Sequence, residues 1–261
     1  MRSNREGLIV TRLRLGLAGL GMAVVAAAVA AVIVAAAQVS ADTIVSTPFT
    51  WQGETWCPTY RAANGCNDVQ QSGSNSSVPF YPAQVTSTGV PASILLKMNA
   101  GATETGAFNT QTYETFSAPA TISEQINVPC NVGGQIENWP AFWLVTTGAW
   151  PAGGEIDVME GLHGYAAWHY HYLNSSGVSS QFGGAVSGFS GCGTHTYQVN
   201  WTTSEIIFYY DGTQVGQVTS AEIGVPLASG PMYVINDYAA SPTYGGPTTG
   251  NVNMQVLHFT P

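Results

Sequence analysis

Three carboxylates lie within six positions of a chain that is otherwise poor in charge. Only 8% of the 261 residues are Asp, Glu, Lys or Arg, yet Glu155, Asp157 and Glu160 follow one another between apolar residues. On a β-strand, Glu155 and Asp157 point to one face, and Glu160, at an odd offset, points to the other. A one-residue bulge at Val158-Met159 would restore the parity and bring all three acids onto one surface.

Such a surface suits the cleavage of a glycosidic bond. The Cα atoms of Glu155 and Glu160 would lie roughly 13 Å apart. Side chains that lean inward would bring the two carboxyls to about 5 Å, the separation that a retaining glycosidase uses. Asp157 would lie between them and hold or polarise one of the pair. The alternative is an acidic strand edge with its charges in water, which would leave a packed apolar face opposite three unpaired acids.

The run Trp150-Pro151-Ala152-Gly153-Gly154 and the acids after it resemble the active-site strand of glycoside hydrolase family 16. The bulged Glu-x-Asp-x-x-Glu form is that of laminarinase-like members, and the resemblance covers roughly residues 50–260 in order. It implies that Glu155 is the nucleophile, Glu160 the general acid and then base, and that Asp157 orients Glu155. The chain departs from the family at Val69, where an acid is common, and lacks the basic residues common after position 120.

The same resemblance indicates sugar-binding residues on other segments. The Trp-Pro-Ala-Phe-Trp run at 139–143 is similar to the strand beside the catalytic one, so Trp143 is a candidate sugar platform, with a core position as the alternative. Trp150 is expected in the cleft. Asn236 and Tyr238 have the spacing of a substrate-binding Asn and an aromatic residue on a late strand. His171 is a further candidate, although either face of 168–172 could line the cleft.

Short runs rich in Val, Ile, Thr, Tyr and Trp, separated by Gly, Ser, Asn and Pro, fill the chain from residue 42 onward. This pattern is typical of an antiparallel sandwich, and no long segment keeps a helical period. The sequence predicts an all-β fold, and the resemblance implies a concanavalin-like jelly-roll β-sandwich of two antiparallel sheets. Strands are expected at 93–99, 121–128, 139–145, 231–238 and 251–259. A hairpin is expected at 195–212, where Asp211-Gly212 is a strong turn signal. No composition break divides 42–261, which is expected to form one catalytic domain.

Residues 1–41 are interpreted as a signal peptide. A basic start and a long Ala/Val/Leu run at 15–37 lead to small residues that place the mature start near Asp42. An uncleaved membrane anchor is the alternative, because the apolar run is long. Without 1–41 the chain keeps 14 acidic residues and two basic ones, Arg61 and Lys97, so its net charge is −12. This charge argues against a nucleic-acid partner and favours a neutral polysaccharide over an anionic one.

Four cysteines follow the leader, an even number that predicts two disulfides in an exported protein. Cys57 and Cys66 are close enough to close a loop, and Cys130 with Cys192 would then join distant loops. Three connectivities remain open. A zinc site is disfavoured because no Cys-x-x-Cys spacing is present. No redox cofactor is implied, and no clear ligand cluster supports a structural calcium.

Together these features predict a secreted, monomeric, retaining endo-β-glucanase. Its expected substrate is a β-1,3- or mixed β-1,3-1,4-glucan, cleaved by double displacement. Two alternatives stay open. One is a non-catalytic, lectin-like sandwich, because fold does not determine function. The other is a transglycosylase or galactanase of the same family.

Overall fold

Two large antiparallel sheets form most of the structure, which confirms the predicted all-β sandwich. The computed structural model describes residues 42–261 apart from 46, 63–64, 68–69, 74 and 90–91. The interpretation of 1–41 as a leader therefore lies outside the described residues. Within the described part of the chain, no helix has the length and apolar character needed to cross a bilayer.

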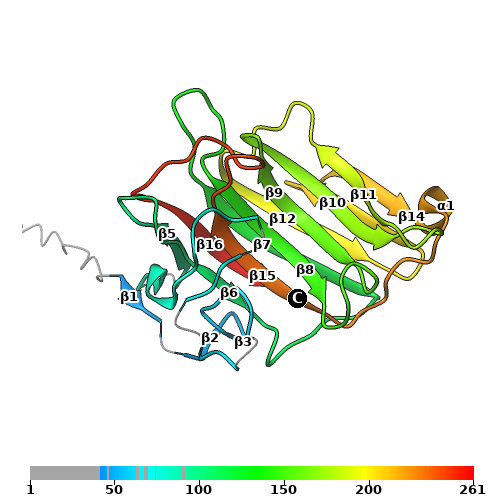
Figure 1. Cartoon of the computed structure of the whole chain (residues 1–261), viewed down its shortest axis with the longest axis horizontal. Helices are drawn as coiled ribbons and strands as arrows, with labels where there is room; N and C mark the ends of the chain where they lie inside the picture. The colour runs from blue at the N-terminus through cyan, green and yellow to red at the C-terminus, as the bar shows by residue number, and fades with distance from the viewer. Residues whose placement is uncertain (1–41, 46, 63–64, 68–69, 74, 90–91) are drawn as a thin grey trace, which may run out of the picture. The chain divides into compact units, whose positions relative to one another are not determined.

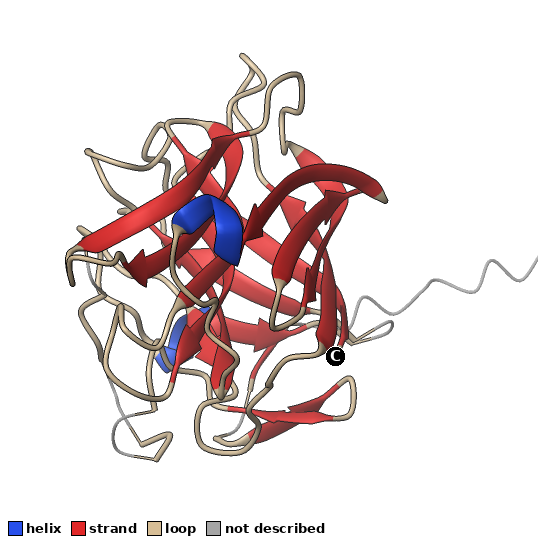
Figure 2. Cartoon of the chain, turned by 90° about the vertical axis from the view of Figure 1, so that its right-hand side faces the viewer, coloured by secondary structure: helices blue, strands red, loops and turns tan. Residues whose placement is uncertain are grey.

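Among the described residues, one sheet has eight strands in the order β1-β4-β5-β16-β7-β12-β13-β14, and the other has six in the order β11-β10-β9-β8-β15-β6. The larger sheet contains β1 (Thr43–Ile44), β4 (Val85–Ser87), β5 (Ile94–Met98), β16 (Val252–Thr260), β7 (Ala120–Val128), β12 (Gly193–Trp201), β13 (Glu205–Tyr210) and β14 (Thr213–Thr219). The smaller contains β11 (Ser179–Ala185), β10 (Tyr165–Leu173), β9 (Glu155–Leu162), β8 (Trp139–Thr146), β15 (Met232–Ala239) and β6 (Ala107–Asn109). A hairpin of β2 (Phe49–Trp51) and β3 (Glu54–Trp56), a 3-10 helix η1 (Pro82–Gln84) and a short helix α1 (Ser220–Ile223) complete the described elements (Figures 1 and 2).

Alternation along the strands builds the interior between the sheets. On β7, Ile122 and Ile126 are buried while Thr121 and Gln125 are exposed. On β9 the interior set is Ile156, Val158 and Met159, each fully buried. Burying one such side chain contributes roughly 1.5–3 kcal/mol. The apolar side chains of β9 thus anchor the strand in the core and leave its other face available for a site.

One polar pair crosses the interior. Glu124 of β7 and Asn236 of β15 are both completely enclosed, and Asn236 Nδ2 donates to Glu124 Oε1 at 2.8 Å. The second oxygen of Glu124 and the amide oxygen of Asn236 have no hydrogen-bond partner. Burial raises the pKa of Glu124 well above its ordinary value, although the Asn236 bond opposes the shift. Glu124 is therefore held as a neutral acid to a higher pH than an exposed glutamate.

We expect Glu124→Gln to weaken the dependence of stability on pH. A carboxyl with a raised folded-state pKa contributes stability that is present at low pH and lost as pH rises through the folded-state pKa. Glutamine carries no proton to lose, so the free energy of unfolding should fall less in the variant between pH 5 and pH 8. Urea unfolding across this range measures the difference, with Glu114→Gln, a change at an exposed glutamate, as control. Parallel curves for the wild type and Glu124→Gln would contradict the assignment.

An N-terminal segment packs on the outer face of the six-stranded sheet. The structure pairs Cys57 with Cys66 and Cys130 with Cys192, one of the three possible connectivities. The backbone of Cys57 bonds to that of Asn109 on β6, with N···O distances of 2.8 and 2.9 Å in the two directions. Tyr60 stacks on Phe80 with ring centroids 4.7 Å apart and lies 6.0 Å from the Trp143 ring of β8. This segment therefore forms a wall over β6, β15 and β8, beside β9.

Candidate active site

A bulge in β9 turns the three acids to one face, as the sequence predicts. Glu160 lies opposite Ala141 of β8 and Asp157 opposite Trp143, so three steps on β9 match two on its neighbour. The other neighbour shows the same shift, because Glu160 pairs with Ala167 of β10 and Asp157 with His169. The extra residue lies at Val158-Met159, and both of these side chains are buried in the core. Apolar side chains at two successive positions thus produce the irregularity that collects the acids.

Glycine at position 154 lets the chain turn into β9. Its φ is +82°, a left-handed conformation that L side chains rarely adopt. A β-carbon at this position would lie 2.6 Å from Ala228 Cβ and 2.8 Å from Met232 Cε. The glycine before Glu155 is therefore required both by the backbone conformation and by the lack of space.

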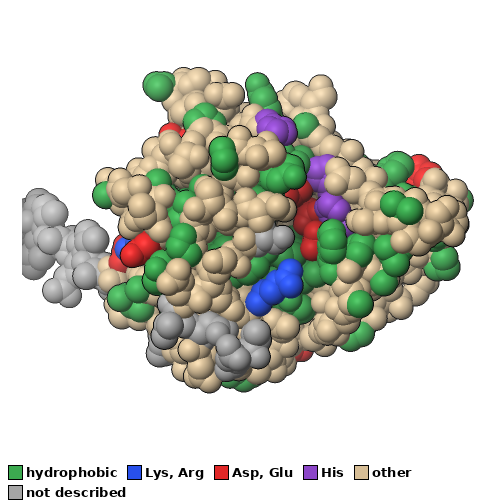
Figure 3. Space-filling model, in the orientation of Figure 1, with side chains coloured by type: hydrophobic (Ala, Val, Ile, Leu, Met, Phe, Trp, Pro, Cys, Tyr) green, Lys and Arg blue, Asp and Glu red, His purple; other side chains and the backbone are tan. Residues whose placement is uncertain are grey.

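The carboxyls form a connected cluster. One oxygen of Glu155, one of Asp157 and a ring nitrogen of His171 all lie within 4.8 Å of one another. The same holds for Asp157, Glu160 and His169. Asp157 is thus the shared member between the two glutamates. Figure 3 shows the acidic side chains at the bottom of a hollow on this face, with histidines beside them.

Each glutamate has its own histidine. His169 Nδ1 lies 2.8 Å from Glu160 Oε2, and Trp139 Nε1 donates to the other oxygen of Glu160 at 3.2 Å. His171 Nε2 lies 3.8 Å from Glu155 Oε1 and 3.1 Å from Asp157 Oδ2. Glu160 is therefore held on both oxygens, whereas Glu155 has only a long contact with its histidine and keeps more freedom to approach a substrate.

Burial and nearby negative charge raise the pKa values of Glu155 and Asp157. Burial raises the pKa of Glu155 well above its usual range, and Asp157 and Glu160 raise it further, while His171 and Arg61 oppose the shift. Burial and Glu160 likewise raise the pKa of Asp157, against the opposing effect of His169. A fourth acid, Asp237 of β15, has its pKa raised to about 7 by burial. Several close carboxyls cannot all ionise together, so the cluster can hold an acid and a base at the same pH.

Two of the five predicted sugar-binding residues lie at this hollow with accessible side chains. Trp150 is 50% exposed, and its ring centroid is 6.1 Å from that of His171, which contacts the acids directly. The face of 168–172 that lines the site is the histidine face, because Tyr170 is buried in the core. Trp143 is on the correct face but only 6% exposed, and its Nε1 donates to Asp237 Oδ2 at 2.8 Å. It supports the floor of the hollow and offers no platform for a sugar ring.

The prediction that Asn236 and Tyr238 bind substrate is wrong in this structure. Both side chains are completely buried and point between the sheets. Asn236 bonds to Glu124, and the Tyr238 hydroxyl accepts from Asn138 Nδ2 at 2.9 Å. The alternate residues of β15, which include Asp237, share a face with the acids. Asp237 pairs with Ala141 of β8, and Ala141 pairs on its other side with Glu160 of β9.

The sequence interpretation missed four residues at the site. Each has a charged or hydrogen-bonding group that acts on one of the acids. They are His169, Trp139, Asp237 and Arg61. For His169 a signal was available, since it alternates with His171 and must share its face. The other three reach the acids only through strand pairing or through the N-terminal segment, which sequence spacing does not reveal.

The two carboxylate–histidine groups have the donor types of a metal site. Each offers two carboxylate oxygens and one imidazole nitrogen, and zinc accepts such ligands.

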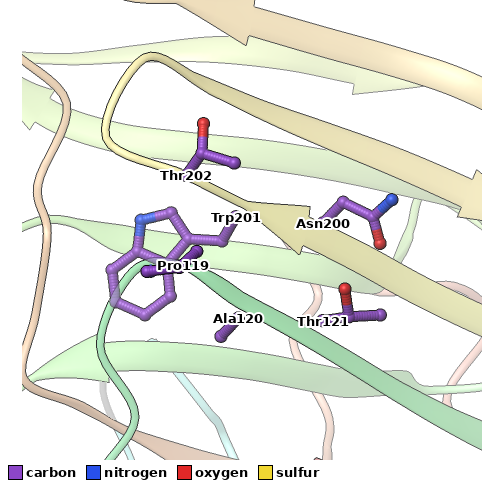
Figure 4. A pocket seen from close by; sticks show the side chains of 6 residues that line it. All are labelled: Pro119, Ala120, Thr121, Asn200, Trp201 and Thr202. Atoms are coloured by element: carbon purple, nitrogen blue, oxygen red, sulfur yellow. The ribbon is translucent and has the colours of Figure 1, made fainter.

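A separate hollow of about 290 Å³ lies on the other sheet and is lined by Pro119, Ala120, Thr121, Asn200, Trp201 and Thr202 (Figure 4). No side chain in its lining is an acid or base, so proton-transfer chemistry belongs to the acid cluster.

A β-sandwich whose open sheet face carries two glutamates around a shared aspartate has the fold and functional groups of a glycoside hydrolase. Residues 74–248 match the model of glycosyl hydrolases family 16, and the chain belongs to this family. The predicted laminarinase-like family is thereby confirmed.

Curated relatives match part of the chain. It is 29% identical over 114 residues to the endo-1,3-1,4-beta-glycanase ExsH of Rhizobium meliloti, a match that covers 43% of this chain and 23% of that protein. A glucan endo-1,3-beta-glucosidase of Niallia circulans is 29% identical over 134 residues, covering 44% and 20%. The chain therefore spans about a quarter or less of the length of these relatives.

Solved structures share the fold. The LamA protein of Zobellia galactanivorans, in complex with laminaritriose and laminaritetraose, superposes with a TM-score of 0.58 at 18% identity, covering 84% of this chain and 95% of that one. A family 16 protein of Bacteroides ovatus in complex with a product gives 0.58 at 19% identity, covering 78% and 94%. At these identities the likeness establishes the jelly-roll architecture.

Proposed function

We propose that this chain is a retaining endo-β-glucanase that hydrolyses β-1,3- or mixed β-1,3-1,4-glucan by double displacement. The observation that carries the proposal is the bulge in β9, which puts Glu155 and Glu160 on one face with Asp157 within 4.8 Å of an oxygen of each. A covalent glycosyl intermediate requires two carboxyls that flank the scissile bond, one that attacks the anomeric carbon and one beside the departing oxygen.

The roles follow the family resemblance. Glu155, as a carboxylate, attacks the anomeric carbon while Glu160 donates its proton to the departing glycosidic oxygen. Glu160 then removes a proton from water, which attacks the same carbon and releases Glu155. Asp157 has a raised pKa and lies beside Glu155. As a neutral acid it can donate a hydrogen bond to the nucleophile without adding a second negative charge.

Aromatic side chains at both ends of the acid row suit a chain of sugars. Trp150 lies by His171 near Glu155, and Trp139 lies by Glu160 with its ring 5.5 Å from that of Tyr244. Sugar rings pack their C–H faces on such rings. The few basic side chains favour a neutral polymer, and the relatives named above are called an endo-1,3-1,4-beta-glycanase and a glucan endo-1,3-beta-glucosidase. These features support a neutral β-glucan as substrate.

A panel of polysaccharides tests the proposal. Purified protein is incubated with laminarin, mixed-linkage β-glucan, a neutral galactan and anionic keratan sulfate, with and without EDTA. We expect new reducing ends and a rapid fall in polymer length on the two glucans, unaffected by EDTA because the carboxyls alone perform the reaction. Binding without cleavage would instead identify a lectin-like protein. Longer products formed from added oligosaccharides would identify a transglycosylase.

Export is part of the proposal. The basic and apolar composition of 1–41 supports a cleaved leader, and the two disulfides are typical of an oxidising compartment. N-terminal sequencing of protein recovered from the medium should begin near Asp42. A monomeric mass on gel filtration is expected for the secreted form.

Replacing His169 with alanine should lower kcat on laminarin by roughly tenfold to a hundredfold. The change removes the 2.8 Å contact that holds Glu160 Oε2, so the acid loses its orientation toward the glycosidic oxygen. His195→Ala is the matched control, because His195 also contacts a carboxylate, that of Asp211 at 2.7 Å, but on the other sheet. Equal effects of the two variants on kcat would contradict a positioning role for His169.

A further inference from the structure

Arg61 is the one described basic side chain, besides the histidines, whose charge acts on the acid cluster. Between residues 42 and 261 the sequence has two Lys or Arg residues, Arg61 and Lys97. Lys97 pairs with Asp42 at 2.9 Å. No carboxylate in the described part of the chain forms an ion pair with Arg61, although its charge opposes the rise in the pKa of Glu155 that burial causes. Figure 3 shows a basic side chain beside the acids in the same hollow.

The backbone at Arg61 is firmly placed. Its N–H donates to Gln71 Oε1 at 2.7 Å, and its carbonyl accepts from Gln71 Nε2. The preceding residue, Tyr60, is buried between Phe80 and Trp143, and the Cys57–Cys66 disulfide closes the same segment. A side chain that projects from this wall is held at a fixed position beside β9.

One donor of the guanidinium group, Nε, is unused. The guanidinium carbon lies 5.6 Å from the centre of the Tyr60 ring, within cation–π range, and the group also interacts with the Tyr60 hydroxyl. Nε of Arg61 is buried, and no described residue supplies it with a hydrogen-bond acceptor. Burial raises the pKa of Tyr233 of β15, and the positive charge of Arg61 opposes this shift. A buried donor without an acceptor is unfavourable in a folded protein, unless a ligand supplies the acceptor.

We propose that Arg61 is a substrate-binding residue of the glucan groove, which donates to hydroxyl oxygens of a sugar next to the scissile bond. The inference rests on the proposed hydrolysis of β-glucan. The planar fork of arginine matches two neighbouring oxygens, as the vicinal hydroxyls of a pyranose present them. Arg61 would place a cation beside the proposed nucleophile. It belongs to the N-terminal segment, which lies outside the strands that carry the acids.

The described groups that interact electrostatically with Glu155 come from β9, β10, β15 and the N-terminal segment. These groups are Asp157 and Glu160 of β9, His171 of β10, Tyr233 of β15, and Tyr60 and Arg61 of the N-terminal segment. Arg61 and His171 favour the carboxylate, and Asp157 and Glu160 oppose it. The pKa values of Tyr60 and Tyr233 are raised by burial, so these two hydroxyls stay neutral and add no opposing charge. Removing Arg61 therefore raises the pKa of Glu155, and the loss of activity toward low pH begins at a higher pH.

The test compares Arg61→Met, Arg61→Lys and Lys97→Met across a pH series on laminarin and mixed-linkage β-glucan. Methionine keeps the stem and removes the charge, so KM should rise about tenfold or more and the acidic limb of kcat/KM should move to higher pH. Lysine keeps the charge without the fork, so the limb should return toward its wild-type position while KM stays raised. Lys97→Met should behave as wild type.

A catalytically inactive background separates binding from chemistry. Laminarihexaose binding to Glu155→Gln, measured by calorimetry, should weaken about tenfold when Arg61→Met is added, and thermal unfolding should show that each variant is folded. Unchanged KM, pH profile and hexaose affinity in folded Arg61→Met would overturn the inference while leaving hydrolysis intact. Failure of the wild type to cleave either glucan would instead reject the proposed function.

Discussion

Turnover of laminarin by Glu155→Gly should be lower than that of the wild type by at least about a thousandfold, and sodium azide should restore part of the activity. The change removes the group that forms the glycosyl bond, so the double displacement cannot begin. The space left at the start of β9 admits a small anion, which attacks the anomeric carbon from the side that Glu155 occupied. One displacement inverts the configuration, so the product is an α-glycosyl azide from a β-glucan. NMR of the azide product identifies the anomer.

A matched control separates this effect from general damage to the sheet. Glu205→Gly removes a glutamate from β13 of the other sheet, where Glu205 Oε2 accepts from Gln217 Nε2 at 2.9 Å. This variant should keep wild-type turnover and gain nothing from azide. Near-normal activity of Glu155→Gly without azide, in protein that unfolds at the wild-type temperature, would exclude Glu155 as the nucleophile.

The arrangement of the acids could be predicted because local rules decide it. Glu155, Asp157 and Glu160 can share a face only if one extra residue is inserted, and Val158 and Met159 are both apolar and can both enter the core. The structure contains the bulge at this point. The all-β fold and the strand positions follow from similarly local patterns. The sequence left the disulfide connectivity open, and one of the two bridges joins Cys130 to Cys192, 62 positions apart.

The error at Asn236 and Tyr238 has an equally physical cause. All eight residues of β15 are buried, so the strand has no alternation from which its two faces can be told apart. Asn236 is polar, but its partner is Glu124 on the opposite sheet, a contact between residues 112 positions apart. A partial signal existed, since Glu124 falls among the apolar positions of 121–128. A carboxyl in that set indicates a polar partner within the core.

The residues around the acids depend on contacts that no short segment encodes. Arg61 reaches the hollow because Tyr60 packs against Phe80 and Trp143, which lie 20 and 83 positions along the chain. Asp237 reaches it through the pairing of β15 with β8. These contacts determine the electrostatics of the site, because they decide which acids lie close enough to a cation or to another acid for their pKa values to shift. The type of reaction is therefore more predictable from the sequence than its pH dependence or substrate preference.

Glu160→Ala should slow the cleavage of a substrate to the extent that its leaving group requires protonation. On laminarin, whose departing sugar oxygen needs a proton, kcat/KM should fall by roughly a hundredfold to ten-thousandfold. On a dinitrophenyl β-oligoglucoside, whose phenolate leaves without a proton, the first step should proceed at close to the wild-type rate. The glycosyl intermediate on Glu155 then accumulates, because no base activates water.

Azide distinguishes the two glutamates by stereochemistry. In Glu160→Ala it replaces water in the second displacement, so the product is a β-glycosyl azide with the configuration of the substrate retained. In Glu155→Gly the product has the α configuration. A loss in Glu160→Ala that is equally large for laminarin and for the dinitrophenyl substrate would exclude Glu160 as the proton donor. An α-azide from Glu160→Ala would reverse the two assignments, because only the variant without a nucleophile can invert in one step.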